Sequence, residues 1–316
     1  MLCTQPLRTR AAGAGGLPMR GTTLIAVTFE RTPTGRYTKE RLAADFTRGD
    51  LSRVVRFPSH SHMERLEIVA DPTEPGNKVM RIAHTEEYGR TPRFAIALDR
   101  MYEEATFRYK VRYGPNEGGT QYPLHSIAKM PGLAGFTERY NTQKEIRPHK
   151  AWYLHADPDP DGPGGVPTLA FSVRSQNFRT DKTGRKARLG GYTYWADMRK
   201  PRVGQPYKGN DAAFIVPGKW HEIALHVVMN TPGAAGGTTA GARDGVMAVY
   251  LDGTKIVDVR TLRFRDDPTH GINSLNLSTF LRETVPGSKK KNHYKARPGY
   301  IYYDALSLTV GAASPR

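Results

Sequence analysis

Cysteine is almost missing from the chain, because Cys3 is the only one among 316 residues. A single cysteine excludes an internal disulfide and any metal site built from a cysteine cluster. Long apolar runs are missing too: none approaches the roughly 20 residues of a membrane-spanning helix, and no membrane partner is expected. The first 20 residues also lack the apolar segment of a secretory signal. Three routes stay open: the chain stays inside the cell, its signal has been removed, or it is released by lysis.

Acidic residues are scarce relative to basic ones. There are 47 Lys and Arg against 30 Asp and Glu, which gives a formal net charge of +17 and a pI near 9.9. Such an excess suits a polyanionic partner, namely nucleic acid, an acidic membrane surface or an acidic polysaccharide, although a soluble protein can also tolerate it. Nucleic-acid binders often carry a basic tail or helix. Here the cations are spread along the chain, with one short run at 289–291, and nucleic acid is not the expected partner.

Long helical stretches are lacking, whereas glycine and proline are abundant at 32 and 23 residues. Alternating or β-branched runs predict strands at 24–29, 64–70, 94–98, 106–113, 168–174, 191–196, 221–229, 245–251, 255–261 and 300–308. Asp252-Gly253 is a hairpin turn signal. We expect an all-β fold, an antiparallel, concanavalin-like β-sandwich of jelly-roll type with few short helices.

The expected organisation is a single domain over residues 22–310. It is preceded by a flexible leader at 1–21, rich in Gly and Arg, and followed by a short tail at 311–316. Residues 37–46 suggest a brief helical or irregular stretch, and 115–167 a long irregular region.

The clearest strand signal is 106–113, where aromatic and aliphatic residues alternate with Arg108, Lys110 and Arg112. The cations therefore share the face opposite the core. They form either a solvated outer face or a basic surface that extends a substrate groove.

A second pair of strands carries polar side chains at alternate positions. Ser172 and Arg174 share a face of one strand, and Tyr192 and Tyr194 share a face of the next. If the strands pair as a hairpin, these four residues lie on one face beneath a basic connection. Each motif by itself is common on sheet surfaces.

Several familiar motifs are not found. The ten histidines show neither His-x-x-x-His nor His-Glu-x-x-His spacing, which disfavours a zinc hydrolase. Gly-x-Ser-x-Gly and Walker-type loops are missing as well, which disfavours an esterase or NTPase. No metal site and no cofactor are expected.

Residues 129–133, Lys-Met-Pro-Gly-Leu, resemble the Lys-Leu-Pro-Gly-Leu segment of polysaccharide lyase family 14, the alginate and glucuronan lyases. That family also carries a Ser-x-Arg strand followed by a Tyr-x-Tyr strand. Further matches to its C-terminal strands are 218–223, Asn230, 244–245, 250–253, 262–265 and 302–304. The resemblance spans roughly residues 105–308. Met130 stands where the family usually has Leu, and Ala134 where an aromatic residue is common.

The resemblance implies β-elimination on an acidic uronate polymer, with the following catalytic residues: Lys129, Ser172, Arg174, Tyr192 and Tyr194. It leaves open which of Lys129 and the two tyrosines is base and which is acid. The expected substrate-binding residues are Arg108, Lys110, Arg112, His125 and Arg188. We expect a monomer acting on extracellular polysaccharide. The alternatives are a non-catalytic jelly-roll module that binds such a polymer and a nucleic-acid-associated protein.

Overall fold

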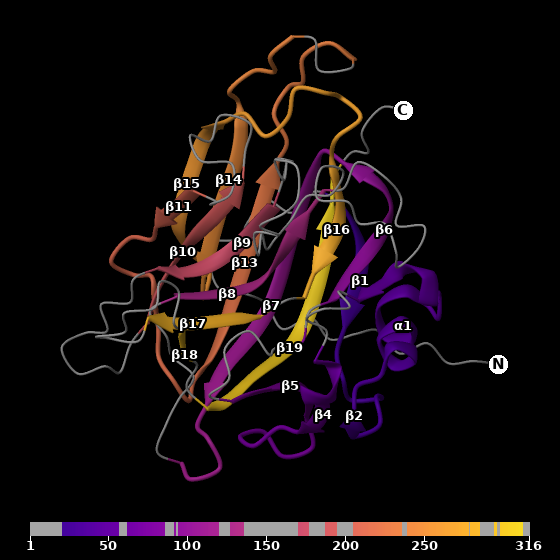
Figure 1. Cartoon of the computed structure of the whole chain (residues 1–316), viewed down its shortest axis with the longest axis vertical. Helices are drawn as coiled ribbons and strands as arrows, with labels where there is room; N and C mark the ends of the chain where they lie inside the picture. Colours follow the sequence, from indigo (N-terminus) through magenta and orange to yellow (C-terminus); the bar gives the residue numbers. More distant parts are fainter. Residues whose placement is uncertain are drawn as a thin grey trace.

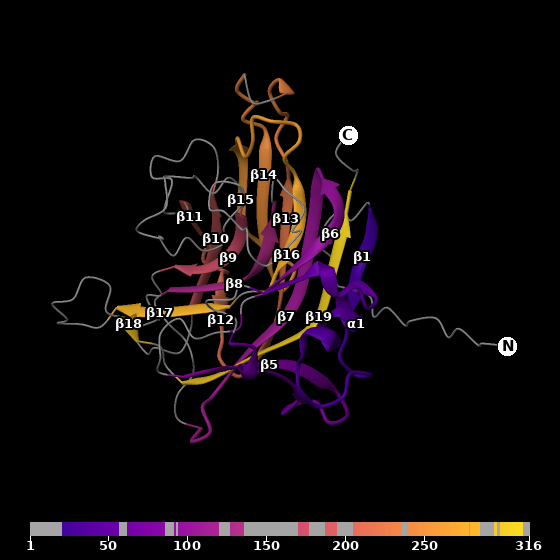
Figure 2. The same cartoon turned by 45° about the vertical axis from the view of Figure 1, so that its right-hand side comes forward.

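A computed structural model of the chain describes residues 21–56, 62–85, 92, 94–119, 127–135, 170–176, 187–194, 205–235, 239–277, 279–284, 294–295 and 298–311. Within these residues almost all regular structure is antiparallel strand, arranged in two main sheets (Figures 1 and 2).

The first sheet, sheet A, has the strand order β15-β14-β13-β7-β19-β5-β4-β2, with β1 also paired to β19. Its strands are β1 (Thr22–Val27), β2 (Gly35–Arg36), β4 (Leu66–Ala70), β5 (Lys78–His84), β7 (Glu104–Gly114), β13 (Trp220–Val228), β14 (Gly245–Leu251), β15 (Thr254–Leu262) and β19 (Gly299–Val310).

The second sheet, sheet B, has the strand order β11-β10-β9-β8-β16-β6-β3, with β12 paired to β10, and β17 paired to β8 and β18. Its strands are β3 (Val54–Arg56), β6 (Phe94–Tyr102), β8 (Ile127–Ala134), β9 (Ala170–Gln176), β10 (Ala187–Tyr194), β11 (Gln205–Lys208), β12 (Phe214–Ile215), β16 (Ile272–Asn276), β17 (Phe280–Thr284) and β18 (Tyr294–Lys295).

One helix, α1 (Lys39–Thr47), lies beside β1 (Figure 1). It begins where the Thr38 side chain accepts a hydrogen bond from the Arg41 amide, and it ends at Arg48 in the left-handed conformation. Two short 3₁₀ turns, at Leu51–Arg53 and Met63–Arg65, complete the described helical structure. No helix in the described ranges is long and apolar enough to span a membrane.

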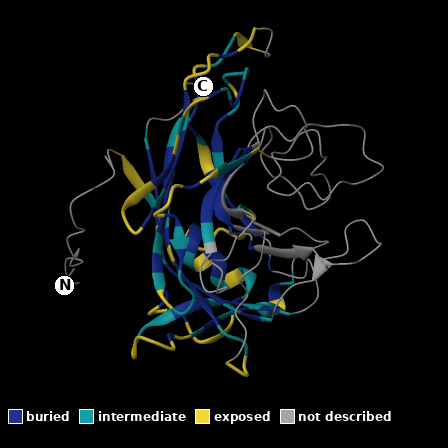
Figure 3. Cartoon of the chain, turned by 90° about the vertical axis from the view of Figure 1, so that its left-hand side faces the viewer, coloured by how far each residue is buried: buried dark blue, intermediate teal, exposed yellow. Residues whose placement is uncertain are grey.

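The core lies between the two sheets, where buried residues line their facing sides (Figure 3). On β7 the odd-numbered side chains from Ala105 to Tyr113 are at most 2% exposed, as alternation predicts. Tyr109 packs edge-on against Tyr303, and its hydroxyl donates to the Pro131 carbonyl of sheet B. Burial raises the pKa of both tyrosines well above the ordinary value.

The expected jelly-roll-type antiparallel sandwich is confirmed, and the Asp252-Gly253 hairpin turn joins β14 to β15. Residues 37–46 are largely helical in α1. One expectation is wrong: 115–167 is not irregular throughout, because β8 lies within it. The single-domain boundaries stay a prediction, and only Gly21 of the expected leader belongs to the described residues.

Candidate active site

Three neighbouring strands of sheet B bring the predicted catalytic positions into line. Lys129 on β8 is the direct cross-strand partner of Arg174 on β9. Ser172 on β9 is in turn the partner of Tyr192 on β10. Directly opposed residues lie on the same side of a sheet, and so do residues two apart in one strand. Lys129, Ser172, Arg174, Tyr192 and Tyr194 therefore share one face, which we call the Lys129 face.

Gly191 identifies which face this is. A Cβ atom at Gly191 would lie 2.7 Å from Met247 Cε, on sheet A, so this residue faces the core between the sheets. Tyr192, the next residue along the strand, has the opposite orientation. The Lys129 face is thus the side of sheet B turned away from sheet A.

The Pro131-Gly132 flank predicts a tight turn directly after Lys129. This prediction is wrong. Pro131 and Gly132 continue the strand, and the register shifts between Lys129 and Gly132. Two residues of β8, Met130 and Pro131, thereby stand opposite one residue of β9. This is a β-bulge, one of the few places where a sheet accepts proline. The Met130 side chain is fully buried, so the bulge is anchored in the core.

Tyr192 is 3% exposed and packs with the buried cluster. For Lys129, Ser172, Arg174 and Tyr194 the structure fixes the strand position, and their side chains lie outside its description. His125, a predicted substrate-binding residue, also lies outside the described residues. The register thus places all five catalytic candidates, whereas their roles stay a prediction.

The Lys129 face continues onto β16, which the sequence reading missed. Asn276 is opposite Gly132, and Ser274 is opposite Ala134. Ser274 and Asn276 alternate with Leu275 and Leu277, both fully buried. This polar–apolar alternation is a strand signal that could have revealed β16.

Arg108, Lys110 and Arg112 do share the non-core face of β7, but this is the outer face of sheet A. Each cation has neighbours from other strands. Arg108 lies 3.5 Å from Glu222, and Lys110 is opposite both Glu222 and Asp304.

Arg112 is 8% exposed, donates to the Gly218 carbonyl and stacks on Tyr302. The three cations therefore lie on the far side of the sandwich from the Lys129 face. The expected extension of a substrate groove by these residues gains no support from this arrangement.

Arg188, the remaining predicted substrate-binding residue, holds the segment that follows β11. Its Nη2 lies 2.7 Å from Asp211 Oδ1, its Nε donates to the Gly209 carbonyl at 3.1 Å, and its guanidinium lies over the Phe214 ring. By alternation it occupies the same side of β10 as Tyr192. These contacts explain a structural role, and a role in substrate binding stays a prediction.

A histidine and an aspartate fix the other end of that segment. The Val216 amide donates to His221 Nε2 at 3.0 Å, so Nδ1 carries the proton and faces Asp252 at 2.7 Å. Burial alone would raise the pKa of the Asp252 carboxyl. The hydrogen bonds from His221 and the Glu222 amide outweigh it and hold that pKa below its ordinary value.

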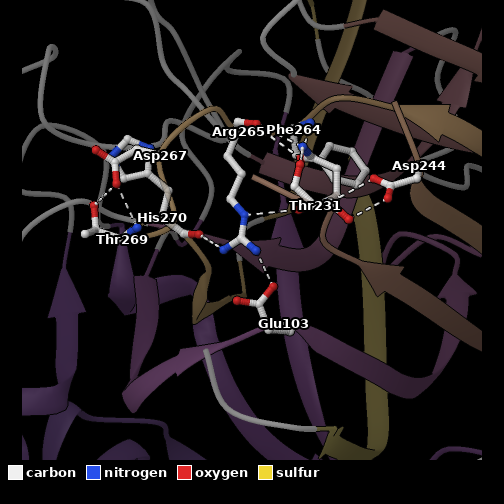
Figure 4. Close-up of polar contacts among 9 residues, drawn as sticks. Glu103, Thr231, Asp244, Phe264, Arg265, Asp267, Thr269 and His270 are labelled. Carbon is white, nitrogen blue, oxygen red and sulfur yellow. Dashed lines mark hydrogen bonds and ion pairs between the residues drawn. The ribbon is translucent and has the colours of Figure 1, made fainter. Parts of the chain in front are cut away.

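A buried arginine organises the chain leading into β16 (Figure 4). Arg265, 3% exposed, pairs with Glu103 and donates to the carbonyls of His270 and Asn230. The Asn230 side chain accepts from the amides of Phe264 and Arg265 at 2.8 and 2.9 Å. Because His270 lies two residues before β16, this network sets where that strand begins. Among the described residues no cluster of His, Cys, Asp or Glu could hold a metal ion.

Comparison with solved structures gives neighbours that share this fold. An alginate lyase mutant, Aly36B, in complex with an alginate tetrasaccharide superposes with a TM-score of 0.60 at 16% identity, covering 92% of this chain and 98% of the other. The marine PL-14 alginate lyase from Aplysia kurodai gives 0.59 at 15% identity, covering 92% and 100%. An alginate lyase from a Chlorella virus gives 0.54 at 13% identity, covering 82% and 91%.

A search of curated protein sequences found no match. The family model described as polysaccharide lyase matches residues 46–273, which include β8, β9 and β10. That match covers well over half of the chain, and the chain therefore belongs to the polysaccharide lyase family.

Proposed function

We propose that this protein cleaves an acidic uronate polymer, alginate or glucuronan, by β-elimination. One observation carries the proposal: the register pairs Lys129 with Arg174 and Ser172 with Tyr192 on one face of sheet B. Membership of the polysaccharide lyase family and the shared fold of three alginate lyases support it. The ordered sequence motifs, which resemble those of polysaccharide lyase family 14, also support it.

The reaction requires charge neutralisation before proton transfer. The C5 proton of a uronate is weakly acidic, and its removal places negative charge on the adjacent carboxylate. Arg174 suits that carboxylate because a guanidinium can meet it with two parallel hydrogen bonds. Lys129, its cross-strand partner, supplies a second cation next to it.

Proton transfer completes the step. A base takes the C5 proton, the C5 electron pair forms the C4–C5 double bond, and the C4–O bond breaks. An acid returns a proton to the departing oxygen, so the products are a new reducing end and a 4,5-unsaturated uronate. Lys129, Tyr192 and Tyr194 are the candidates for base and acid, and Ser172 is a hydrogen-bond partner.

The test is incubation with polymannuronate, polyguluronate and glucuronan, followed by ultraviolet absorbance of the unsaturated uronate. The proposal expects that signal on at least one polymer. Retention of the protein on a polyuronate column without the signal would instead identify a binding module. Binding to DNA or RNA with a steeper salt dependence than to polyuronates would identify a nucleic-acid-associated protein.

A further inference from the structure

Directly opposed residues on neighbouring strands form rows across sheet B, and the rows that hold the predicted catalytic residues continue beyond β8. One row runs Tyr192, Ser172, Gly132 and Asn276, on β10, β9, β8 and β16. The next row runs Tyr194, Ala170, Ala134 and Ser274 on the same four strands. At the usual strand spacing of about 4.8 Å, each row extends about 14 Å from β10 to β16.

The side of β16 that these two residues occupy follows from their neighbours. Leu275 is opposite Leu133, and both are fully buried members of the core cluster. Ser274 and Asn276 flank Leu275, and they therefore lie on the Lys129 face. Their β6 partners are Ala97 and Ala95. The direct neighbours of Ser274 and Asn276 in both rows are therefore glycine or alanine. Ser274 and Asn276 have longer side chains than these neighbours.

The Ser274 hydroxyl has a feature that a purely structural residue rarely shows. It is fully buried, and its oxygen has no hydrogen-bond partner among the described residues. A buried hydroxyl without a partner costs about 1–3 kcal/mol of stability, so it calls for an explanation. Asn276, 2% exposed, brings an amide that can both donate and accept on the same face.

We propose that Ser274 and Asn276 bind substrate, by hydrogen bonds to the hydroxyl and carboxylate groups of the sugar next to the one held by Lys129 and Arg174. β16 flanks β8 on the side opposite to β9, so the two residues extend the binding row along the polymer. This inference rests on the proposed function. It assigns the missing partner of Ser274 to the substrate, and it makes a neutral amide at position 276 a requirement for binding an acidic chain.

The experiment compares Asn276→Asp, Asn276→Ala and Ser274→Ala with the wild-type protein in steady-state lyase assays. Ser307→Ala is the matched control, because Ser307 lies on β19 at the outer face of sheet A. Asn276→Asp places a carboxylate against an acidic substrate and should raise KM about 10-fold or more, with kcat within about 3-fold of the wild type. Ser274→Ala should raise KM about 5-fold, the loss of one hydrogen bond of about 1 kcal/mol. The control should leave both parameters unchanged.

Thermal unfolding separates binding from structure. If the Ser274 hydroxyl serves the substrate, Ser274→Ala should have a Tm equal to or above that of the wild type, because a buried unpaired group is removed. A fall of several degrees would make the hydroxyl structural and overturn its assignment. If Asn276→Asp does not fold, Asn276→Ala carries the test, with a rise in KM of about 5-fold. If the folded Ser274 and Asn276 variants keep the KM of the wild type, this inference is overturned and the proposed function stands. An inactive wild-type protein on every polyuronate would overturn the proposed function, and this inference with it.

Discussion

The two outer faces of the sandwich differ in how their basic residues are partnered, although both are formed by alternating strands. The outer face of sheet A carries cations with partners from neighbouring strands, such as Arg81 with Glu67 and Arg108 with Glu222. A continuous row crosses five strands there: Glu67, Arg81, Tyr302, Arg112 and Trp220. On the Lys129 face of sheet B, two cationic positions, Lys129 and Arg174, are instead direct cross-strand partners, and small residues stand beside Ser274 and Asn276.

This difference shows that cation count on a strand is a poor guide to a binding surface. β7 has the more conspicuous run of basic residues, yet acids from β13 and β19 stand opposite Lys110. Ion pairs at an outer face contribute modestly to stability. Because the opposite charges largely cancel, such pairs attract an anionic ligand only weakly. Lys129 on β8 and Arg174 on β9 are opposed to each other, and an anion bound between two such cationic positions would be stabilised by both.

The largest expected difference between the two faces is the effect on kcat of removing a lysine from each. Lys129→Ala is expected to lower kcat by about 10²-fold or more, the usual scale for losing a general base or a charge stabiliser. Lys110→Ala, its control on the opposite face, should change kcat less than 2-fold, an expectation that follows from its acidic neighbours. Lyase assays and thermal melts of both variants provide the measurement. More than half of the wild-type activity in a folded Lys129→Ala variant would remove this residue from the mechanism.

The Arg265 network, which precedes β16, should contribute strongly to the free energy of unfolding. Arg265→Met leaves Glu103 without its partner and frees the Asn230 and His270 carbonyls. Breaking a buried ion pair in this way costs about 3 kcal/mol. Denaturant unfolding should show that loss, whereas Arg260→Met, at an exposed position, should change the free energy of unfolding by less than about 0.5 kcal/mol. Similar small effects in both variants would show that β16 is held by other contacts.

Neutralising the basic face of sheet A sharpens the comparison through substrate length. The variant Arg108→Gln with Lys110→Gln should change KM by less than about 2-fold, and equally for polymer and short oligomer, because the face points away from Lys129. Initial rates on both substrates are the measurement. A rise in KM confined to the polymer would place the chain of sugars on sheet A and restore the expectation drawn from the sequence.

Asp304 provides the smallest expected effect, on stability alone. Burial raises the pKa of this carboxyl above its ordinary value, and its Oδ1 has no hydrogen-bond partner among the described residues. A folded-state pKa above the unfolded one means that stability falls as pH rises through these values. Asp304→Asn should therefore raise Tm at neutral pH by about 1–3 °C, and the gain should vanish below about pH 4. Melting curves across that range test the sign.

Local pattern in the sequence was enough for much of the fold, whereas the five catalytic candidates came from the resemblance to a known family, and their roles stay a prediction. β7, β13 and β14 follow simple alternation, and the Ser-x-Arg and Tyr-x-Tyr strands pair as the sequence suggests. β8 could not be read in this way, because Pro131-Gly132 predicts a turn and the bulge that accommodates it depends on neighbouring strands.

The partners of the basic residues were also beyond local pattern. Glu222 and Asp304 lie more than a hundred residues from Lys110 in the sequence and reach it only through sheet register. Ser274 and Asn276 join the Lys129 face by the same kind of long-range pairing. Register between distant strands depends on the whole sandwich, and no short motif encodes it.

The bulge at Met130 and Pro131 has a consequence for how relatives of this chain can vary. Strand side chains alternate with a period of two, so Lys129 and Gly132, which are three residues apart, share a face only because the bulge lies between them. Replacing Met130 by another apolar residue preserves that count, and such changes should be tolerated. Deleting one of the two bulged residues would leave Lys129 two positions from Gly132 and on the same face, as in a regular strand. Inserting a further residue would instead turn Lys129 toward the core while leaving Leu133 in place. Relatives should therefore tolerate a shorter segment here better than a longer one.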